Sequence, residues 1–176
     1  MKNNDFYMLS KISKKLKKHD FICEITSKYG RPHLDVDTWE FPYETVLGML
    51  ISVEGNSLKL EFMNFRTVKG ATNDFEDDDC SNRFQATAYC DAFESVASKT
   101  PGLNNLKFIV DCNGLPTIDA SSEIFIPRKN TGKFYNYVAH NIIDIFDKLD
   151  AAMPEIIELG GRLYEERGKQ PVKKRV

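Results

Sequence analysis

The stretch that decides the fold is residues 106–127, LKFIVDCNGLPTIDASSEIFIP. Two runs rich in β-branched and apolar residues flank Cys112, Asn113 and Gly114, and Asn-Gly favours the tight turn of a β-hairpin. We therefore predict strands over residues 107–112 and 115–125. The stretch contains no recognisable catalytic motif, so the role of this hairpin has to be inferred from the elements around it.

The first half of the chain also carries strand patterns. We expect strands over residues 21–29, 33–43, 46–53 and 58–68. Residues 54–57 (EGNS) supply a hairpin turn, and residues 30–32 (GRP) predict another turn. Pro42 limits a strand at 33–43 to an edge of the sheet, because proline cannot donate to a strand ladder.

Helical spacing of apolar residues appears in segments 5–19, 84–99 and 133–149. Asp5 is expected to cap the first helix and Thr131 the last. Pro154 is expected to break or kink the last helix and to start another over 155–167. The acidic run within 70–82 predicts a loop.

Strand runs between helices predict an α+β fold with an antiparallel sheet: helix, β-meander, helix, β-hairpin, long C-terminal helix. A single domain is expected over 1–168, followed by a basic flexible tail at 169–176. The residues expected to be largely buried are Phe62, Phe93, Phe108, Ile142, Ile145 and Phe146.

The composition is that of an ordinary globular protein: 176 residues, 41% apolar, with a net charge of -2. The sequence contains no signal-peptide pattern and no apolar run of bilayer length, so we expect a cytoplasmic protein without a membrane partner. The basic first helix suits a membrane surface as well, but an apolar stripe on a short helix usually faces its own core.

Four cysteines are the candidate nucleophiles, and none belongs to a Cys-x-x-Cys pair. Cys23, Cys90 and Cys112 lie in apolar patterns typical of core positions, whereas Cys80 has acidic neighbours that raise a thiol pKa. The candidate bases are His19, His33 and His140. No local signature joins a cysteine to a histidine, so we predict free thiols in a reducing compartment and no catalytic residues.

Two sets of residues are candidate metal ligands. The acidic run consists of Asp74, Glu76, Asp77, Asp78 and Asp79, which lacks the spacing and the glycine of an EF-hand loop. His33, Asp35 and Asp37 alternate on one side of a strand, which is also the pattern of a polar strand face. We predict no metal-binding residues.

Phosphate and nucleic-acid binding have weaker support. No glycine-rich phosphate loop occurs, and Gly160-Gly161 lies inside a helical pattern, where it either permits close helix packing or weakens the helix. Basic residues gather in the first helix and the tail, but aromatic residues are not interleaved with them. A cofactor and a nucleic-acid partner are therefore not expected.

The order of elements resembles the YbjN-like proteins, whose fold is similar to that of type III secretion chaperones. The resemblance is best over residues 85–161: a helix, the strand KFIVD, the turn CNG, the strand LPTIDASSEIF and a closing helix with a proline near its end. Segments 70–82 and 30–43 depart from the short form of the pattern. The resemblance implies a non-enzymatic α+β domain, commonly dimeric, in a fold whose chaperones hold extended segments of partner proteins. It carries over no site residues.

We therefore expect a protein-binding or regulatory domain that holds a partner of unknown identity on the sheet face left uncovered by helices, through strand addition or apolar pockets. Two alternatives remain: a nucleic-acid-associated protein that uses the basic first helix and tail, and a Cys/His-dependent enzyme.

A homodimer is also expected, because residues 133–167 carry more apolar positions than one sheet face needs. Ile142 and Ile143 point in different directions on a helix, as do Ile156 and Ile157. The alternative is a monomer in which this helix is simply central.

Overall fold

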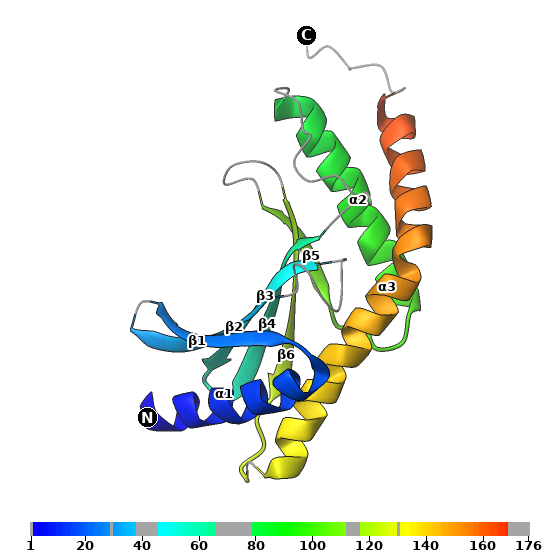
Figure 1. Cartoon of the computed structure of the whole chain (residues 1–176). Coiled ribbons are helices and arrows are strands. Elements are labelled where there is room, and N and C mark those ends of the chain that lie inside the picture. Colours follow the sequence, from blue (N-terminus) through cyan, green and yellow to red (C-terminus); the bar gives the residue numbers. More distant parts are fainter. Residues whose placement is uncertain are drawn as a thin grey trace.

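The computed structural model describes residues 2–28, 30–37, 46–65, 79–111, 117–129 and 131–168 (Figure 1). The helices are α1 (Lys2–Leu16), the short 3-10 helix η1 (Lys17–His19), α2 (Asp79–Lys99) and α3 (Gly132–Gly168). The strands are β1 (Ile22–Lys28), β2 (Arg31–Asp37), β3 (Val46–Glu54), β4 (Ser57–Phe65), β5 (Lys107–Asp111) and β6 (Thr117–Phe125).

The strands form a 6-stranded antiparallel sheet in the order β1-β2-β3-β4-β6-β5. The predicted α+β fold with an antiparallel sheet is therefore confirmed. Within the described part of the chain, β1 and β5 are the edge strands. The two strands of the opening hairpin pair as expected, and β6 joins that hairpin to the meander through β4.

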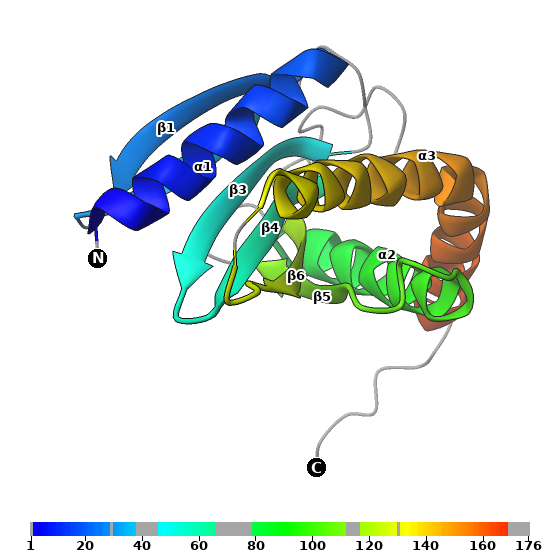
Figure 2. The same cartoon turned by 90° about the horizontal axis from the view of Figure 1, so that it is seen from below.

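The helices share one face of the sheet. Cys23, Val36, Met49, Phe62, Ala120 and Phe108 stand opposite one another across all the strands, and all are buried. On this face α1 packs against β1 and β2, α2 packs against β5 and β6, and α3 lies between the two helices (Figure 2). The opposite face of the sheet is left uncovered by these helices.

Aromatic rings make the centre of the core. The ring of Phe146 on α3 lies 5.8 Å from that of Phe21 and 5.6 Å from that of Phe62, measured between centroids. Phe93 stacks on Phe108 with centroids 5.2 Å apart, which joins α2 to β5. The prediction that Phe62, Phe93, Phe108, Ile142, Ile145 and Phe146 are buried is confirmed.

Two helix boundaries differ from the prediction. The helix α1 begins at Lys2, so Asp5 lies in its first turn and is not the capping residue. The helix α2 begins at Asp79, so the predicted loop over 70–82 ends earlier than expected. Acidic residues are favourable near a helix N-terminus, because they interact with the unpaired backbone N–H groups there. An apolar repeat cannot reveal such polar first turns.

The strand β2 corrects the prediction for residues 30–43. Gly30 has a φ of 70°, which allows the chain to reverse at once, and β2 starts at Arg31 and contains Pro32. Pro32 stands opposite Ser27 near the hairpin end, where a missing N–H is tolerated. The strand lies between β1 and β3, so the expected edge position is wrong. Pro42, the basis of that expectation, lies outside the described residues.

Pro154 was expected to break or kink the last helix and to start another; the second helix over 155–167 is wrong, whereas the kink agrees with the course of α3 (Figure 2). The helix α3 runs unbroken from Gly132 to Gly168, with Pro154 inside it, and it changes direction along its length (Figure 2). An interior proline removes one backbone hydrogen bond and bends a helix, but packing on both sides of the bend can hold the two halves together.

Other predictions have mixed outcomes. The turn between β3 and β4 is confirmed, with Gly55 at a φ of 60°. The hairpin turn with Cys112 and Pro116, the acidic residues at 74–78 and the tail at 169–176 lie outside the described residues. The division into one domain and a tail stays a prediction.

Candidate interaction surface

The sheet face opposite the helices, called the open face from here on, carries two rows of mainly polar side chains that cross the strands. In the first row the strand register places Glu24, Asp35, Leu50, Glu61, Ser121 and Lys107 opposite one another. In the second row it places Thr26, His33, Ser52, Lys59 and Glu123. Neighbours in such rows lie close enough to interact, with Cβ atoms about 5 Å apart.

Acidic residues outnumber basic residues on the open face. Its described acidic residues are Glu24, Asp35, Asp37, Glu54, Glu61, Asp111, Asp119 and Glu123. Its basic residues with a described side chain, which follow from the same register, are Arg31, Lys59 and Lys107. This face therefore attracts cationic groups and repels phosphates.

Two carboxylates stand side by side at the β1–β2 pair. Glu24 and Asp35 stand directly opposite each other, and like charges in this position destabilise a sheet. The Thr26 hydroxyl donates a hydrogen bond to Asp35 Oδ2 at 2.6 Å, which fixes that carboxylate. A cationic group placed over the two carboxylates would relieve their repulsion.

The middle of the open face holds an ion pair. Lys59 Nζ lies 2.7 Å from Glu61 Oε1, and both side chains are about one-third exposed. The hydrogen bond that Lys59 donates to Glu61 raises the pKa of Lys59 above its ordinary value, and the negative charges of Glu61, Glu54 and Glu123 add to that increase. Lys59 thus neutralises one carboxylate of the first row and leaves Glu24 and Asp35 to interact with a ligand.

The two cysteines with described side chains, Cys23 and Cys90, are buried free thiols. Burial raises the pKa of Cys23 to about 11, against a smaller lowering by Lys17 and Ser13. Burial also raises the pKa of Cys90 to about 11, and Glu94 and Asp91 add to it. Cys23 points to the helix side of the sheet, whereas His33 belongs to the open face. Cys80 and Cys112 carry no described side chain.

The histidines lie in two places. The rings of His19 and His140 meet edge to face with centroids 5.9 Å apart, which joins η1 to α3. His140 Nδ1 also lies 2.7 Å from the carbonyl oxygen of Asn136, one turn earlier in the same helix. His33, Asp35 and Asp37 share the open face, but the described residues contain no cluster of three ligands able to hold a metal ion.

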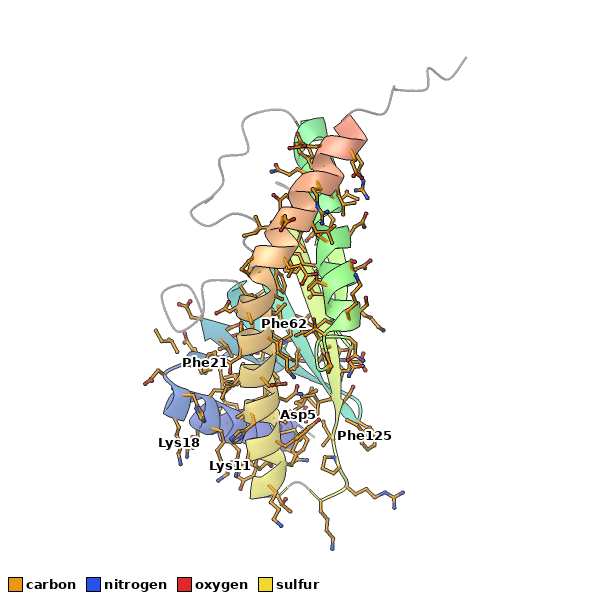
Figure 3. The ribbon with its side chains drawn as sticks, turned by 90° about the vertical axis from the view of Figure 1, so that its right-hand side faces the viewer. Asp5, Lys11, Lys18, Phe21, Phe62 and Phe125 are labelled. Carbon is orange, nitrogen blue, oxygen red and sulfur yellow. The ribbon has the colours of Figure 1, made fainter. Side chains whose placement is uncertain are left out.

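The basic first helix presents its lysines to the outside. Lys11 Nζ lies 4.9 Å from the centre of the Tyr7 ring, and Lys11 and Lys18 project from the outer side of α1 and η1 (Figure 3). The C-terminal end of α3, from which the basic tail continues, lies at the opposite end of the molecule from α1 (Figure 1). No helix in the described part of the chain is long and apolar enough to cross a bilayer.

The apolar surplus of α3 is largely used within the chain. Ile142, Ile145 and Ile156 are buried, while Ile143 and Met153 are partly buried against the same core. Gly160 meets the ring of Tyr89 on α2, so this glycine permits close helix packing. The expected homodimer stays a prediction.

Sequence reasoning missed the exposed apolar residues of the sheet. Ile22 is 65% exposed on β1, Ile109 is 59% exposed on β5 and Phe125 is 71% exposed at the end of β6. Alternation within KFIVD contained the signal, since Phe108 and Ile109 must point to opposite faces. Which of the two faces is covered becomes known only from the sheet order.

Comparison with known proteins supports the fold. No protein-family model and no curated protein matches the sequence. Among solved structures, the chain is similar to the crystal structure of YbjN from E. coli, a protein proposed to be a transcription regulator. The TM-score is 0.50, the match covers 88% of this chain and 92% of that chain, and the sequences are 11% identical. The chain therefore has a YbjN-like α+β fold.

Proposed function

We propose that this chain is a non-catalytic protein-binding domain that holds a basic, extended segment of a partner protein on the open face of its sheet. The observation that carries the proposal is the acidic first row, in which the register places the two acidic residues Glu24 and Asp35 directly opposite each other. A partner's lysine or arginine side chain supplies the missing charge.

The dimensions of the open face suit a short segment. Adjacent strands lie about 4.8 Å apart, so a segment that crosses the 6-stranded sheet spans about 24 Å, the length of about seven extended residues. An exposed ion pair contributes about 0.2–1 kcal/mol, so several pairs are needed for useful affinity. Binding is therefore expected to be salt-sensitive and in the micromolar range or weaker.

The alternatives have less support. Phosphates would be repelled by the open face, and the basic helix α1 lies at the opposite end of the molecule from the C-terminal end of α3 (Figure 1). The buried thiols of Cys23 and Cys90 have raised pKa values, which disfavours the reactive thiolate form. The similarity to YbjN concerns the fold alone.

The test is a binding titration with three fluorescent peptides of equal length, in which valine alternates with lysine, glutamate or serine. We expect anisotropy to rise with the lysine peptide and not with the other two. The variant Glu24→Gln/Asp35→Asn should bind the lysine peptide about tenfold more weakly, because it removes two exposed charge pairs.

The matched control is Glu155→Gln/Glu158→Gln, which makes the same change of net charge on the exposed surface of α3. This variant should bind the lysine peptide as the unmodified protein does. Equal binding by all three peptides, or equal losses in the two variants, would show that the open face is not the binding surface.

A further inference from the structure

We propose that one end of the molecule, made by α1, η1 and residues 126–133 and called the basic end from here on, binds the surface of a bilayer that contains anionic lipids. Residues 2–19 contain six lysines and one aspartate, and residues 126–133 contain two lysines, one arginine and no acidic residue. These segments are far apart in the sequence, but their described parts lie together at the lower end of the molecule in Figure 1 and Figure 3. The fold thus brings two basic segments onto one surface.

Contacts between α1, η1 and α3 make the basic end continuous. Lys11 Nζ lies 4.9 Å from the centre of the Tyr7 ring. Burial raises the pKa of Tyr135 in the first turn of α3, Tyr7 adds to that increase and Lys11 opposes it, so both side chains of α1 lie within electrostatic reach of Tyr135. The rings of His19 and His140 meet edge to face, with centroids 5.9 Å apart. The outer sides of α1 and of the first turns of α3 therefore belong to the same surface.

The basic side chains of this end point away from the core. The apolar stripe of α1 faces the core, with Leu9, Ile12 and Leu16 fully buried, so a bilayer contacts the opposite side of this helix. Figure 3 shows Lys11 and Lys18 projecting from that side. The basic residues at exposed positions of this end are Lys14, Lys17, Lys18, Arg128, Lys129 and Lys133.

Two aromatic side chains accompany the lysines of α1. Phe6 and Tyr7 are each 54% exposed. Such rings gain stability at the boundary between lipid headgroups and acyl chains, and lysines beside them attract anionic headgroups. A single-stranded nucleic acid is usually held in a basic groove, whereas these side chains lie on the convex outside of a helix. The combination therefore favours a bilayer surface over a nucleic acid.

The proposed contact leaves the open face accessible. The helix α1 packs on β1 and β2 from the helix side of the sheet, and the open face is the other side. An anionic bilayer attracts the basic end and repels Glu24 and Asp35 on the open face. The exposed Asp20 after η1 and the exposed Asp144 on α3 border the basic end. The protein is therefore expected to bind with its open face turned away from the lipid.

Sedimentation of the full chain with large vesicles tests the proposal. We expect binding to vesicles of phosphatidylcholine with about 30% phosphatidylserine, and none to phosphatidylcholine alone. A lysine near an anionic surface contributes about fivefold in affinity, so Lys14→Glu/Lys18→Glu should weaken binding at least about tenfold. A rise from about 0.1 M to about 0.5 M salt should release the bound protein, because salt screens exposed charges.

The matched control is Lys99→Glu/Arg162→Glu, which makes the same change of net charge at exposed positions on α2 and on the C-terminal half of α3. This variant should bind the anionic vesicles to within about threefold of the unmodified protein. Phe6→Ser/Tyr7→Ser should weaken binding about tenfold and leave its salt dependence unchanged, because the rings are lost and the charges stay. Circular dichroism spectra confirm that each variant is folded.

Three results would overturn the proposal: no binding to the anionic vesicles at low salt, equal binding to both kinds of vesicle, or equal losses in the two charge-reversal variants. A single-stranded DNA oligonucleotide that binds at a lower concentration than the vesicles, and is lost in Lys14→Glu/Lys18→Glu, would assign the basic end to nucleic acid and overturn it as well. The variant Glu24→Gln/Asp35→Asn should retain vesicle binding, so this result is separate from that of the peptide titration.

Discussion

Gly160 offers a sharp test of how α2 and α3 pack. A Cβ atom added at Gly160 would lie 2.4, 2.6 and 2.8 Å from three carbon atoms of the Tyr89 ring, whereas carbon atoms prefer separations of about 3.5–4.0 Å. Tyr89 is buried, so its ring cannot move aside freely. We therefore expect Gly160→Ala to force the two helices apart or to push the ring out of its place.

The magnitude follows from two opposing effects. Alanine stabilises a helix interior by about 1 kcal/mol relative to glycine. Overpacking of a filled site costs about 1–3 kcal/mol and more where the neighbour is rigid. With three contacts below 3 Å at Gly160, we expect a net loss of about 1–2 kcal/mol in the free energy of unfolding. For a chain of 176 residues each kcal/mol corresponds to about 2–4 °C in the melting temperature.

The neighbouring glycine is the control. A Cβ at Gly161 would approach Tyr89 no closer than 4.0 Å, so Gly161→Ala should stabilise the chain by about 0.5–1 kcal/mol. Urea denaturation followed by circular dichroism measures both variants. In a Tyr89→Ala background, Gly160→Ala should no longer destabilise, because the clashing ring is gone. If Gly160→Ala and Gly161→Ala stabilise the chain equally, the close approach of α2 and α3 is refuted.

Further predictions concern the core and the thiols. Phe146→Ala should lower the free energy of unfolding by about 3–5 kcal/mol, because its ring packs against Phe21 and Phe62. The exposed Phe125 is the control, and Phe125→Ala should change the free energy of unfolding by less than about 0.5 kcal/mol. An unchanged urea midpoint for Phe146→Ala would contradict the burial of this face of α3. In a Cys80→Ser/Cys112→Ser variant, Cys23 and Cys90 should react with a disulfide reagent at about pH 8 only after urea is added, since burial raises both pKa values to about 11. These thiols stay neutral in the folded chain and ionise at a lower pH in the unfolded chain, so their contribution to stability is present below about pH 9 and is lost as the pH rises toward about 11. Fast labelling of both thiols without urea would show that they are accessible.

Much of the fold follows from local patterns. Apolar residues at helical spacing identified the buried faces of α1 and α3, and the alternation over 58–62 identified the buried and the solvent-facing side of that part of β4. These patterns are visible because burial of one face imposes a period on the sequence. Boundaries were less predictable, since Lys2 and Asp79 enter helices through polar turns that leave no apolar signal.

The candidate surface depends on information that is not local. His33, Asp35 and Asp37 were expected on one side of a strand, and the structure places them on the open face. Their neighbour Glu24 became part of the same surface only through the register of β1 against β2. A sequence states which residues share a face of one strand, but the pairing of strands decides which residues share a site.

The continuity of α3 shows how tertiary packing overrides a local signal. Taken alone, Pro154 removes a backbone hydrogen bond and costs a helix about 3 kcal/mol, which is reason enough to predict a break. On one side of Pro154, however, α3 is held by the contact of His140 with His19 and by Phe146 in the core. On the other side it is held by Gly160 against Tyr89 and by the ion pair of Arg167 with Asp91. A break would forfeit one of these two sets of contacts, whereas a bent helix keeps both, so α3 can pack on α1 with one half and on α2 with the other. The residue that predicted two helices is thus compatible with a single helix that spans the covered face and leaves the opposite face open.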